Sequence, residues 1–324
     1  FSIATFFIIG SVIVYQQISY LTAKDLGFKG DKVISVALSF PDSEYEVANV
    51  GQNIYNKYTR IKQELNKIKG VEQASTGLIS FDGSDNSLGA VMYKETLFKE
   101  RTIAVDYGML EMMSIKVIKG RGLEQKYAAD TISSVLINEA AQNLMQMKDP
   151  IGQEVTIRNR KLNIVGVVKD FNLLSPEVDV PPMVFYHLKT MDIAQNMSTV
   201  YVKLKSDNIE NTMADIEKLW LSVDKENPFQ YDFVDKQYAR TYESYVKQKN
   251  LFSLLNVVVI GIALFGLFAL ASYSIQSRMK EIAIRKTLGA QTNVLLKELS
   301  KQYILFCITG FLVALFPVYY LLNK

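Results

Sequence analysis

Residues 252–290 of the chain are FSLLNVVVIGIALFGLFALASYSIQSRMKEIAIRKTLGA, and this stretch decides the class of protein. Its first part, 252–275, contains no charged side chain. A helix of about 20 residues crosses a hydrocarbon core of roughly 30 Å, so this part is long enough to span a membrane. The segment that follows is basic, and we therefore predict that the chain leaves the membrane near Gln276.

Two further stretches without charge predict additional spans. Residues 303–322 form one, in which neighbouring helices would satisfy the carbonyl freed by Pro317. Residues 1–14 are too short to cross alone, and we interpret them as the outer part of a span whose beginning is missing. A signal peptide is the competing interpretation. It is disfavoured because no basic segment precedes the run and no small-residue cleavage site follows Val14.

The distribution of charge predicts which way the chain faces. The loop 276–302 has a net charge of +4, from Arg278, Lys280, Arg285, Lys286, Lys297 and Lys301 against Glu281 and Glu298. Short loops rich in Lys and Arg stay on the cytoplasmic side of a membrane. Residues 15–251 are then expected to face outward. A fourth span would follow the third, and it is absent from this sequence.

The average composition hides two parts of different character. The chain is 49% hydrophobic and 21% charged, yet the segment 15–251 is nearly neutral, with 29 basic and 31 acidic side chains. This division excludes a purely soluble protein, a disordered chain and a nucleic-acid binder driven by positive charge. The only cysteine, Cys307, lies in an apolar run, which excludes a disulfide framework and a cysteine-based zinc site.

The outward segment 15–251 has the pattern of an α+β domain, of one or two lobes, on helical stalks and spans. Strands are predicted at 32–40, 71–80, 102–106, 115–119, 134–138, 154–158, 162–169, 183–186, 199–204 and 230–234. Helices are predicted at 52–69, 107–113, 139–147 and 209–223, and from Asp235 directly into the second span. We expect Gly70 to end the first of these helices with a left-handed backbone, a loop at 83–87 and a hairpin turn at Asn159-Arg160.

The chain carries no recognisable catalytic constellation. His187 is the only histidine, and a GxSxG motif is absent, so a structural or surface role is favoured over a catalytic one. Asp42, Glu44 and Glu46 are evenly spaced, as in a solvated loop. Neither a GxxxxGK[ST] phosphate loop nor a GxGxxG motif occurs. We therefore predict no catalytic residue, no bound cofactor and no metal site.

The segment Ser277–Ala290 has the pattern of a short basic amphipathic helix. Glu281 and Arg285 are spaced to form an ion pair one turn apart, and Gly289 is a natural helix end. A second helix is predicted at 292–300. Physical chemistry alone leaves two interpretations open. The helix either contacts anionic lipid and sets the topology, or docks on a cytoplasmic partner as a lever.

The sequence KEIAIRKTLGA, residues 280–290, closely resembles the E-I-[GA]-[IL]-R-[KR]-x-[LM]-G-A signature of FtsX-like permeases, the MacB-type (type VII) ABC transporters. The resemblance covers the whole chain. The opening YQQISYLTAKDLGFKGDKVI is similar to the first span and stalk of these permeases. The segments VLINEAAQNLMQMKDPIGQEVTI and LNIVGVVKDFN, together with Lys119-Gly120-Arg121, resemble the MacB-like periplasmic core domain.

The resemblance implies a mechanotransmission permease, multi-pass in a bacterial inner membrane with its large domain in the periplasm. A separate cytoplasmic ABC ATPase would use ATP, and the permease would not itself be an enzyme. Arg278, Glu281, Arg285 and Lys286 would face this ATPase or order the loop, and Gly289 and Ala290 would turn the chain. Stalks are expected at 15–25 and 235–250. Further expected partners are a second permease half, identical or duplicated, membrane lipid, and a periplasmic adaptor or hydrolase.

The function implied is export of a drug, a peptide or a lipoprotein. An alternative from the same family is a regulator that transports nothing and switches a periplasmic hydrolase or a sensor kinase. A membrane-anchored hydrolase conflicts with the absence of a nucleophile constellation. Two motifs of the core domain need no ligand. Asn138 is predicted to cap the helix that follows it, and Asp170-Phe171-Asn172 to form a turn with a buried aromatic ring.

Overall fold

The computed structural model describes residues 2–23, 25–46, 48–82, 88–174, 178–205, 208–223, 227–241 and 243–289, and the short pieces 291, 301, 304–305, 308–313, 315 and 319. The chain divides into two compact units. The helical unit combines Phe1–Ala23 with Glu243–Lys324, and the core domain is Lys24–Tyr242. The predicted loop at 83–87, the predicted helix at 292–300 and most of the predicted span 303–322 lie outside the described residues.

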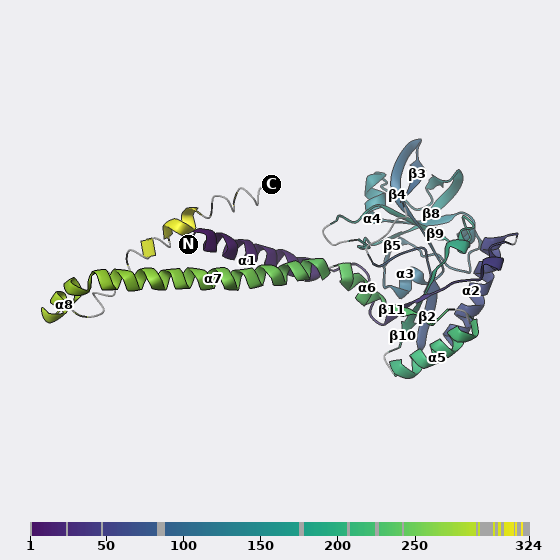
Figure 1. Cartoon of the computed structure of the whole chain (residues 1–324). Helices are drawn as coiled ribbons and strands as arrows, with labels where there is room; N and C mark the ends of the chain where they lie inside the picture. Colours follow the sequence, from purple (N-terminus) through teal and green to yellow (C-terminus); the bar gives the residue numbers. More distant parts are fainter. Residues whose placement is uncertain are drawn as a thin grey trace. The chain divides into compact units, whose positions relative to one another are not determined.

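The helical unit contains α1 (Ser2–Ala23), α7 (Glu243–Ser277) and α8 (Met279–Thr287), as Figure 1 shows. Helix α1 packs along α7, where the Lys249 ammonium lies 4.2 Å from the centre of the Tyr15 ring. Within the described residues, one helix is long and apolar enough to cross a membrane, at Tyr245–Ser277. This helix contains the predicted span 252–275, and its most apolar part is not buried inside the protein.

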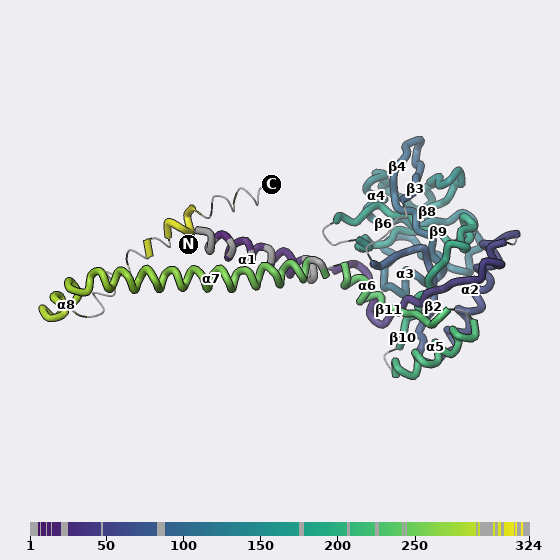
Figure 2. Tube along the Cα trace, viewed as in Figure 1, coloured from purple at the N-terminus to yellow at the C-terminus, as the bar shows by residue number. Residues whose placement is uncertain are grey.

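The first sheet of the core domain has four antiparallel strands in the order β11-β1-β10-β2. Their bounds are Val33–Ala37 (β1), Val71–Thr76 (β2), Thr199–Leu204 (β10) and Tyr231–Phe233 (β11). Helices α2 (Val50–Lys67) and α5 (Ile209–Val223) lie side by side over it (Figure 2). Helix α2 buries Ile54, Tyr58, Ile61 and Leu65, the helical spacing that predicted it, and α5 buries Trp220.

The second sheet has seven strands in the order β5-β8-β6-β9-β4-β3-β7. Their bounds are Leu88–Tyr93 (β3), Thr96–Val105 (β4), Val117–Gly120 (β5), Ser134–Asn138 (β6), Glu154–Ile157 (β7), Arg160–Val168 (β8) and Met183–His187 (β9). Strand β7 pairs with both β3 and β8, so the pairing runs in a closed ring from β8 through β6, β9, β4, β3 and β7. Strand β6 is buried at every position because Val135 and Ile137 belong to one apolar cluster, and Leu136, on the opposite face, belongs to a second.

The two sheets are joined where β2 leads into Gly77, which bridges to Val105 at the end of β4. One apolar cluster extends from under α2 into the ring, so the sheets share a core rather than forming two separate lobes. Shorter elements complete the domain: α3 (Met109–Met112), α4 (Glu139–Leu144), α6 (Val234–Thr241) and the 3-10 turns Asp42–Glu44, Ala128–Thr131 and Ala194–Asn196. The prediction of a mixed α+β domain is confirmed.

Besides shifts at the ends of elements, such as β2 ending at Thr76 and α4 at Leu144, the structure differs from the sequence predictions at three places. Gly70 does not adopt a positive φ; it is needed because a side chain there would collide with Thr212. The hairpin turn between β7 and β8 lies one residue earlier than predicted, with positive φ at Arg158 and Asn159. The hairpin of β3 and β4 was not predicted before Thr102, because apolar side chains such as Leu88 and Met92 point outward while the charged Glu100 points inward, which hides the strand alternation.

Candidate functional site

Helix α8 begins almost directly where α7 ends. Arg278 is the only residue between them, with φ −108° and ψ 13°. Its N–H donates to the carbonyl of Ile275 at 3.2 Å, and its own carbonyl accepts from the N–H of Ile282 at 3.0 Å. The chain ends α8 at Gly289, which has φ +91° as expected of a glycine that stops a helix.

The predicted ion pair of α8 forms. Arg285 Nη2 lies 2.7 Å from Glu281 Oε1, and about half of each side chain is exposed. An exposed pair of this spacing is worth about 0.3–0.5 kcal/mol, so it orders the helix without stabilising the fold much. Arg278 and Lys286 are also exposed, and Ala290 lies outside the described residues.

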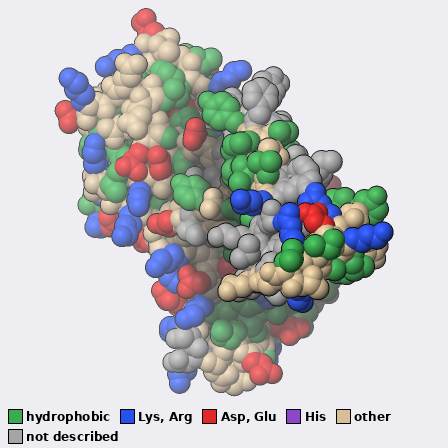
Figure 3. Space-filling model, turned by 90° about the vertical axis from the view of Figure 1, so that its left-hand side faces the viewer, with side chains coloured by type: hydrophobic (Ala, Val, Ile, Leu, Met, Phe, Trp, Pro, Cys, Tyr) green, Lys and Arg blue, Asp and Glu red, His purple; other side chains and the backbone are tan. Residues whose placement is uncertain are grey.

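Helix α8 also exposes apolar side chains beside its charges. Met279, Ile284 and Leu288 are 57%, 60% and 82% exposed, and no described residue of α8 is buried. Figure 3, which views the molecule from the side of α8, shows Lys and Arg side chains gathered around an acidic one next to hydrophobic ones. The arrangement carries no nucleophile or proton-transfer pair. It is suited to contact with another surface.

The core domain holds a buried network centred on Asp106, at the end of β4. One carboxylate oxygen of Asp106 accepts from Tyr55 Oη at 2.8 Å and from His187 Nε2 at 3.2 Å. The other accepts from Tyr58 Oη at 2.7 Å and from Lys62 Nζ at 2.6 Å. Three of these donors lie on α2 and the fourth ends β9, so the network ties α2 to the second sheet.

The network fixes the protonation of its members. The Lys189 N–H donates to His187 Nδ1 at 3.1 Å, so the proton of the neutral ring is on Nε2, facing Asp106. Burial alone would raise the pKa of Asp106, but the hydrogen bonds from His187, Lys62 and Tyr58 hold it well below its usual value. Burial, followed by the charge of Asp106, raises the pKa of Tyr58. His187 is fully buried and held by hydrogen bonds on both ring nitrogens, so it is not on the surface.

A second buried carboxylate has no such partners. Glu100 on β4 is 1% exposed, and both of its carboxyl oxygens lack a hydrogen-bond partner within the described residues. It lies opposite Gly89 on β3 and shares the inner face of the ring with Val91. Burial raises the pKa of Glu100 to about 7. No sequence pattern predicted this burial, because strand spacing alone does not tell which face of β4 is enclosed.

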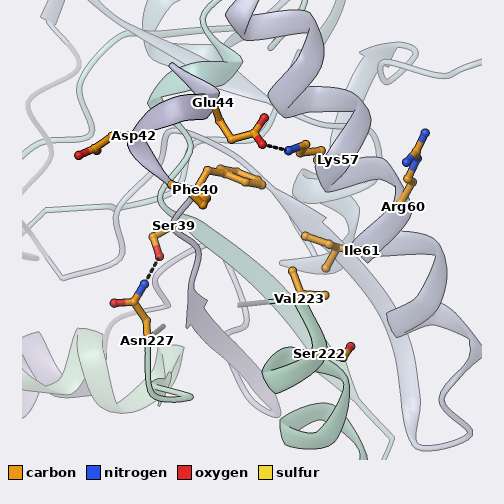
Figure 4. A pocket seen from close by; sticks show the side chains of 11 residues that line it. Ser39, Phe40, Asp42, Glu44, Lys57, Arg60, Ile61, Ser222, Val223 and Asn227 are labelled. Carbon is orange, nitrogen blue, oxygen red and sulfur yellow. Dashed lines mark hydrogen bonds and ion pairs between the residues drawn. The ribbon is translucent and has the colours of Figure 1, made fainter. Parts of the chain in front are cut away.

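A groove of about 600 Å³ lies between the Asp42–Glu44 turn, α2 and the end of α5. Figure 4 shows Phe40, Ile61 and Val223 as its apolar part, and an ion pair between Glu44 and Lys57 at its rim. The two carboxylates of the turn were predicted to be a solvated loop, and both line this rim. None of the lining side chains is a histidine or cysteine.

The motifs of the core domain hold the fold together. Asn138 Oδ1 accepts from the N–H of Ala141 at 2.9 Å, which is the predicted helix cap, and from the N–H of Met183 at 2.8 Å. Asp170 Oδ1 also accepts from the start of α4, and Phe171 is buried and stacked on Phe185. A search of the described residues finds no group of three His, Cys, Asp or Glu side chains that could hold a metal ion.

Comparison with known sequences matches both units. The family model of the MacB-like periplasmic core domain matches residues 2–219, and that of the FtsX-like permease C-terminal region matches 253–323. The macrolide export ATP-binding/permease protein MacB of Neisseria gonorrhoeae is 24% identical over 236 residues, covering 70% of this chain and 36% of that protein. The uncharacterized ABC transporter permease YknZ of Bacillus subtilis is 21% identical, covering 87% of this chain and 70% of that protein. The chain thus spans 36% of the length of the MacB relative.

Two solved structures are similar to the core domain. The periplasmic region of MacB from Actinobacillus actinomycetemcomitans has a TM-score of 0.48 and 16% identity, and the match covers 67% of this chain and 94% of that one. The extracellular domain of YknZ from Gram-positive bacteria has a TM-score of 0.43 and 15% identity, covering 62% and 98% of the two chains.

Proposed function

This chain belongs to the FtsX-like permeases that carry a MacB-like periplasmic core domain, and from that premise we propose that it is the membrane subunit of an ABC exporter that works by mechanotransmission. A cytoplasmic ATPase binds and hydrolyses ATP. The permease carries the resulting movement to the core domain on the other side of the membrane. Its own residues make no covalent bond with the substrate.

The observation that carries the proposal is that α8 follows α7 after a single residue, Arg278. Helix α7 runs unbroken from Glu243, one residue after the core domain ends, to Ser277, and α8 starts two residues later. A continuous helix transmits displacement along its axis because every turn is fixed by backbone hydrogen bonds. Since α1 packs along α7, both connections to the core domain belong to the same helical unit.

Helix α8 is the proposed contact with the ATPase. Its exposed Ile284 and Leu288 are one turn apart and would enter an apolar groove, while Arg278, Arg285 and Lys286 would meet acidic side chains at the rim. The net charge of the 276–302 loop supports its place in the cytoplasm. The core domain then lies in the periplasm, and the chain in the inner membrane of a bacterium.

The names of the relatives favour export over regulation. The MacB relative is described as an exporter with ATP-binding and permease parts in one protein, whereas the YknZ relative is described as a permease. We therefore propose a separate ATPase, two permease halves for each complex, and an exported drug, peptide or lipoprotein.

The test is the ATPase activity of the full-length permease copurified in lipid with the ATPase encoded beside it. Arg285→Glu is expected to reverse the charge that faces the ATPase and to reduce copurification at least about tenfold. The double variant Glu281→Arg with Arg285→Glu restores the ion pair within α8 but not the contact with the partner. It is expected to remain uncoupled if α8 is a lever.

A matched control comes from the same helical unit. Glu243 and Lys247 form an exposed ion pair of the same spacing on α7, with 2.9 Å between Glu243 Oε1 and Lys247 Nζ. Swapping those two charges is expected to leave the ATPase bound and coupled. If the intact permease binds no ATPase, or if the swap in α8 has no more effect than the swap in α7, the proposal is wrong and α8 is a lipid-surface helix.

A further inference from the structure

The ring of the core domain has an outer face whose composition is unusual. The register places Leu97 of β4, Met92 of β3, Thr156 of β7 and Lys161 of β8 in one row across four antiparallel strands. The next two positions along the hairpin pair Ala90 with Lys99, and Leu88 with Arg101. Residues directly opposite in a sheet point to the same side, so all of these share one face. We call this set the outer ring face.

The outer ring face exposes large apolar side chains. Leu88, Leu97 and Met92 are 72%, 61% and 44% exposed. The opposite side of the same strands is already filled, since Val91 is 0% exposed. Solvent-facing positions of an antiparallel sheet are normally polar, so these three do not serve the packing of their own domain. Their burial against another surface would be favourable because it removes apolar area from water.

The charge of the outer ring face is positive. Its described charged side chains are Lys99, Arg101 and Lys161 on the strands above, and Glu154 next to Lys161. Glu154 forms an ion pair with Lys161 at 2.9 Å, and Lys99 has no ion-pair partner in the part of the chain that the structure describes. The cation of Lys99 lies between the apolar side chains of Leu97 and Leu88. A partner must therefore present an acidic group and apolar side chains side by side.

We infer that the outer ring face is a docking site for a second protein, one that presents apolar side chains bordered by carboxylates. The inference rests on the proposed function, in that the core domain must act on another periplasmic component. Apolar contact at Met92 and Leu97 provides the affinity, and the unpaired Lys99 sets the orientation through an acidic residue of the partner. Methionine suits such a surface because its side chain adapts to the shape that meets it.

Two other occupants fit the face less well. A second copy of this chain, docked through the same face, would bring Lys99 and Arg101 against cations of the same kind. A membrane surface is contacted mainly through Trp and Tyr at the level of the head groups, and the outer ring face exposes Leu and Met instead. Figure 1 shows β3 and β4 at one end of the core domain, well away from α5, so a partner could reach this face without touching α5.

The test places a photo-crosslinking amino acid at Met92 in the full-length chain, expressed with its neighbouring ATPase in its own membrane. The control places it at Ile132, which is 63% exposed and outside the outer ring face. We expect a discrete protein adduct at Met92, absent at Ile132 and identified by mass spectrometry. Lys99→Glu is expected to reduce its yield at least about tenfold, whereas Lys99→Arg and the control Lys116→Glu preserve it.

Each outcome decides the matter. A single protein adduct that depends on the charge at residue 99, and that is restored by the reverse charge in the identified partner, supports the site. An adduct with lipid, an adduct with a second copy, no adduct, or insensitivity to Lys99→Glu overturns it. Thermal unfolding of the variants shows that they are folded. Binding of the ATPase is assayed in the same samples. If the adduct is lost while the ATPase is still bound, only this inference is wrong. If the unmodified chain does not bind the ATPase, the proposed function is wrong.

Discussion

Two ion pairs, one in each unit, show what burial does to a charge. Asp106 is 1% exposed in its pair with Lys62, and it accepts hydrogen bonds from four side chains. Glu281 and Arg285 are joined at a similar distance of 2.7 Å, but both are about half exposed. The first pair holds parts of one domain together. The second stabilises its own chain little, and both of its side chains are exposed, where another molecule can reach them.

The difference follows from solvation. A buried carboxylate has lost its hydrating water, so the loss of any hydrogen-bond partner destabilises the folded state strongly. An exposed ion pair gives up contacts with water to form a salt bridge, so it adds almost nothing to the free energy of folding. Stability measurements should therefore respond strongly to the first pair and weakly to the second, while measurements of coupling to the ATPase should show the opposite order. The only tryptophan, Trp220, is buried in the core domain, so its fluorescence follows the unfolding of that domain within the full chain.

The largest expected effect is that of Asp106→Ala. It leaves Lys62, Tyr55, Tyr58 and His187 without their common acceptor, and it is expected to lower the free energy of unfolding by about 3–5 kcal/mol. Urea unfolding followed by Trp220 fluorescence measures it. Lys62→Met, which leaves the carboxylate three donors, should cost clearly less. If Asp106→Ala does not fold, Asp106→Asn gives the same comparison in a milder form, and a loss under about 1 kcal/mol would show that the network does not tie α2 to the ring.

The next effect concerns pH and Glu100. Its pKa is raised from 4.5 to about 7 by burial, so between these values the folded state holds a proton that the unfolded state has lost. The contribution is complete below pH 4.5, and the free energy of unfolding should fall by about 3 kcal/mol as the pH rises through 7.

The measurement is the free energy of unfolding of wild type and of Glu100→Gln, compared at each pH from 4 to 8. The glutamine variant cannot ionise, so it should lose this part of the pH dependence. Glu95→Gln, at the exposed turn of the same hairpin, is the matched control and should keep it. Parallel curves for wild type and Glu100→Gln would mean that water or a rearranged side chain solvates the carboxylate within the ring.

The smallest effect on stability is expected in α8. Glu281→Ala should change the unfolding of the core domain, followed by Trp220, by about 0.5 kcal/mol or less, because the lost pair is exposed and lies in the other unit. The same variant is expected to weaken coupling to the ATPase. A shift of the Trp220 transition by more than about 1 kcal/mol would contradict the contrast between the two pairs.

The regular elements could be predicted where their pattern is local. The spacing of Ile54, Tyr58, Ile61 and Leu65 predicted α2, and the predicted bounds of α5 agree with the structure. The predicted bounds of β6, 134–138, also agree with the structure, in which every position of this strand is buried. The exposed pair of α8 could be predicted as well, because its two members are four residues apart in the same helix.

The Asp106 network could not be predicted, because its members are distant in the sequence. Tyr55 and His187 are 132 residues apart and meet only through the order of the strands. The only signal was His187 itself, for which the sequence favours a structural or surface role without indicating its partners. Glu100 escaped detection for a related reason: an alternating strand has two faces, and only closure of the ring decides which one is enclosed.

The sequence by itself determined the long apolar part of α7, the basic helix after it, the family and the mixed α+β class. These depend on runs, spacings and motifs among neighbours in the chain, whose hydrogen bonds and hydrophobic faces form locally. The tertiary structure alone decided that the two sheets share one core and that Asp106 accepts hydrogen bonds from four side chains. It also decided that Leu88, Met92 and Leu97 are exposed on the same face. Those features depend on which strands lie side by side and in which register, and that choice is made by long-range burial of apolar surface rather than by any local pattern.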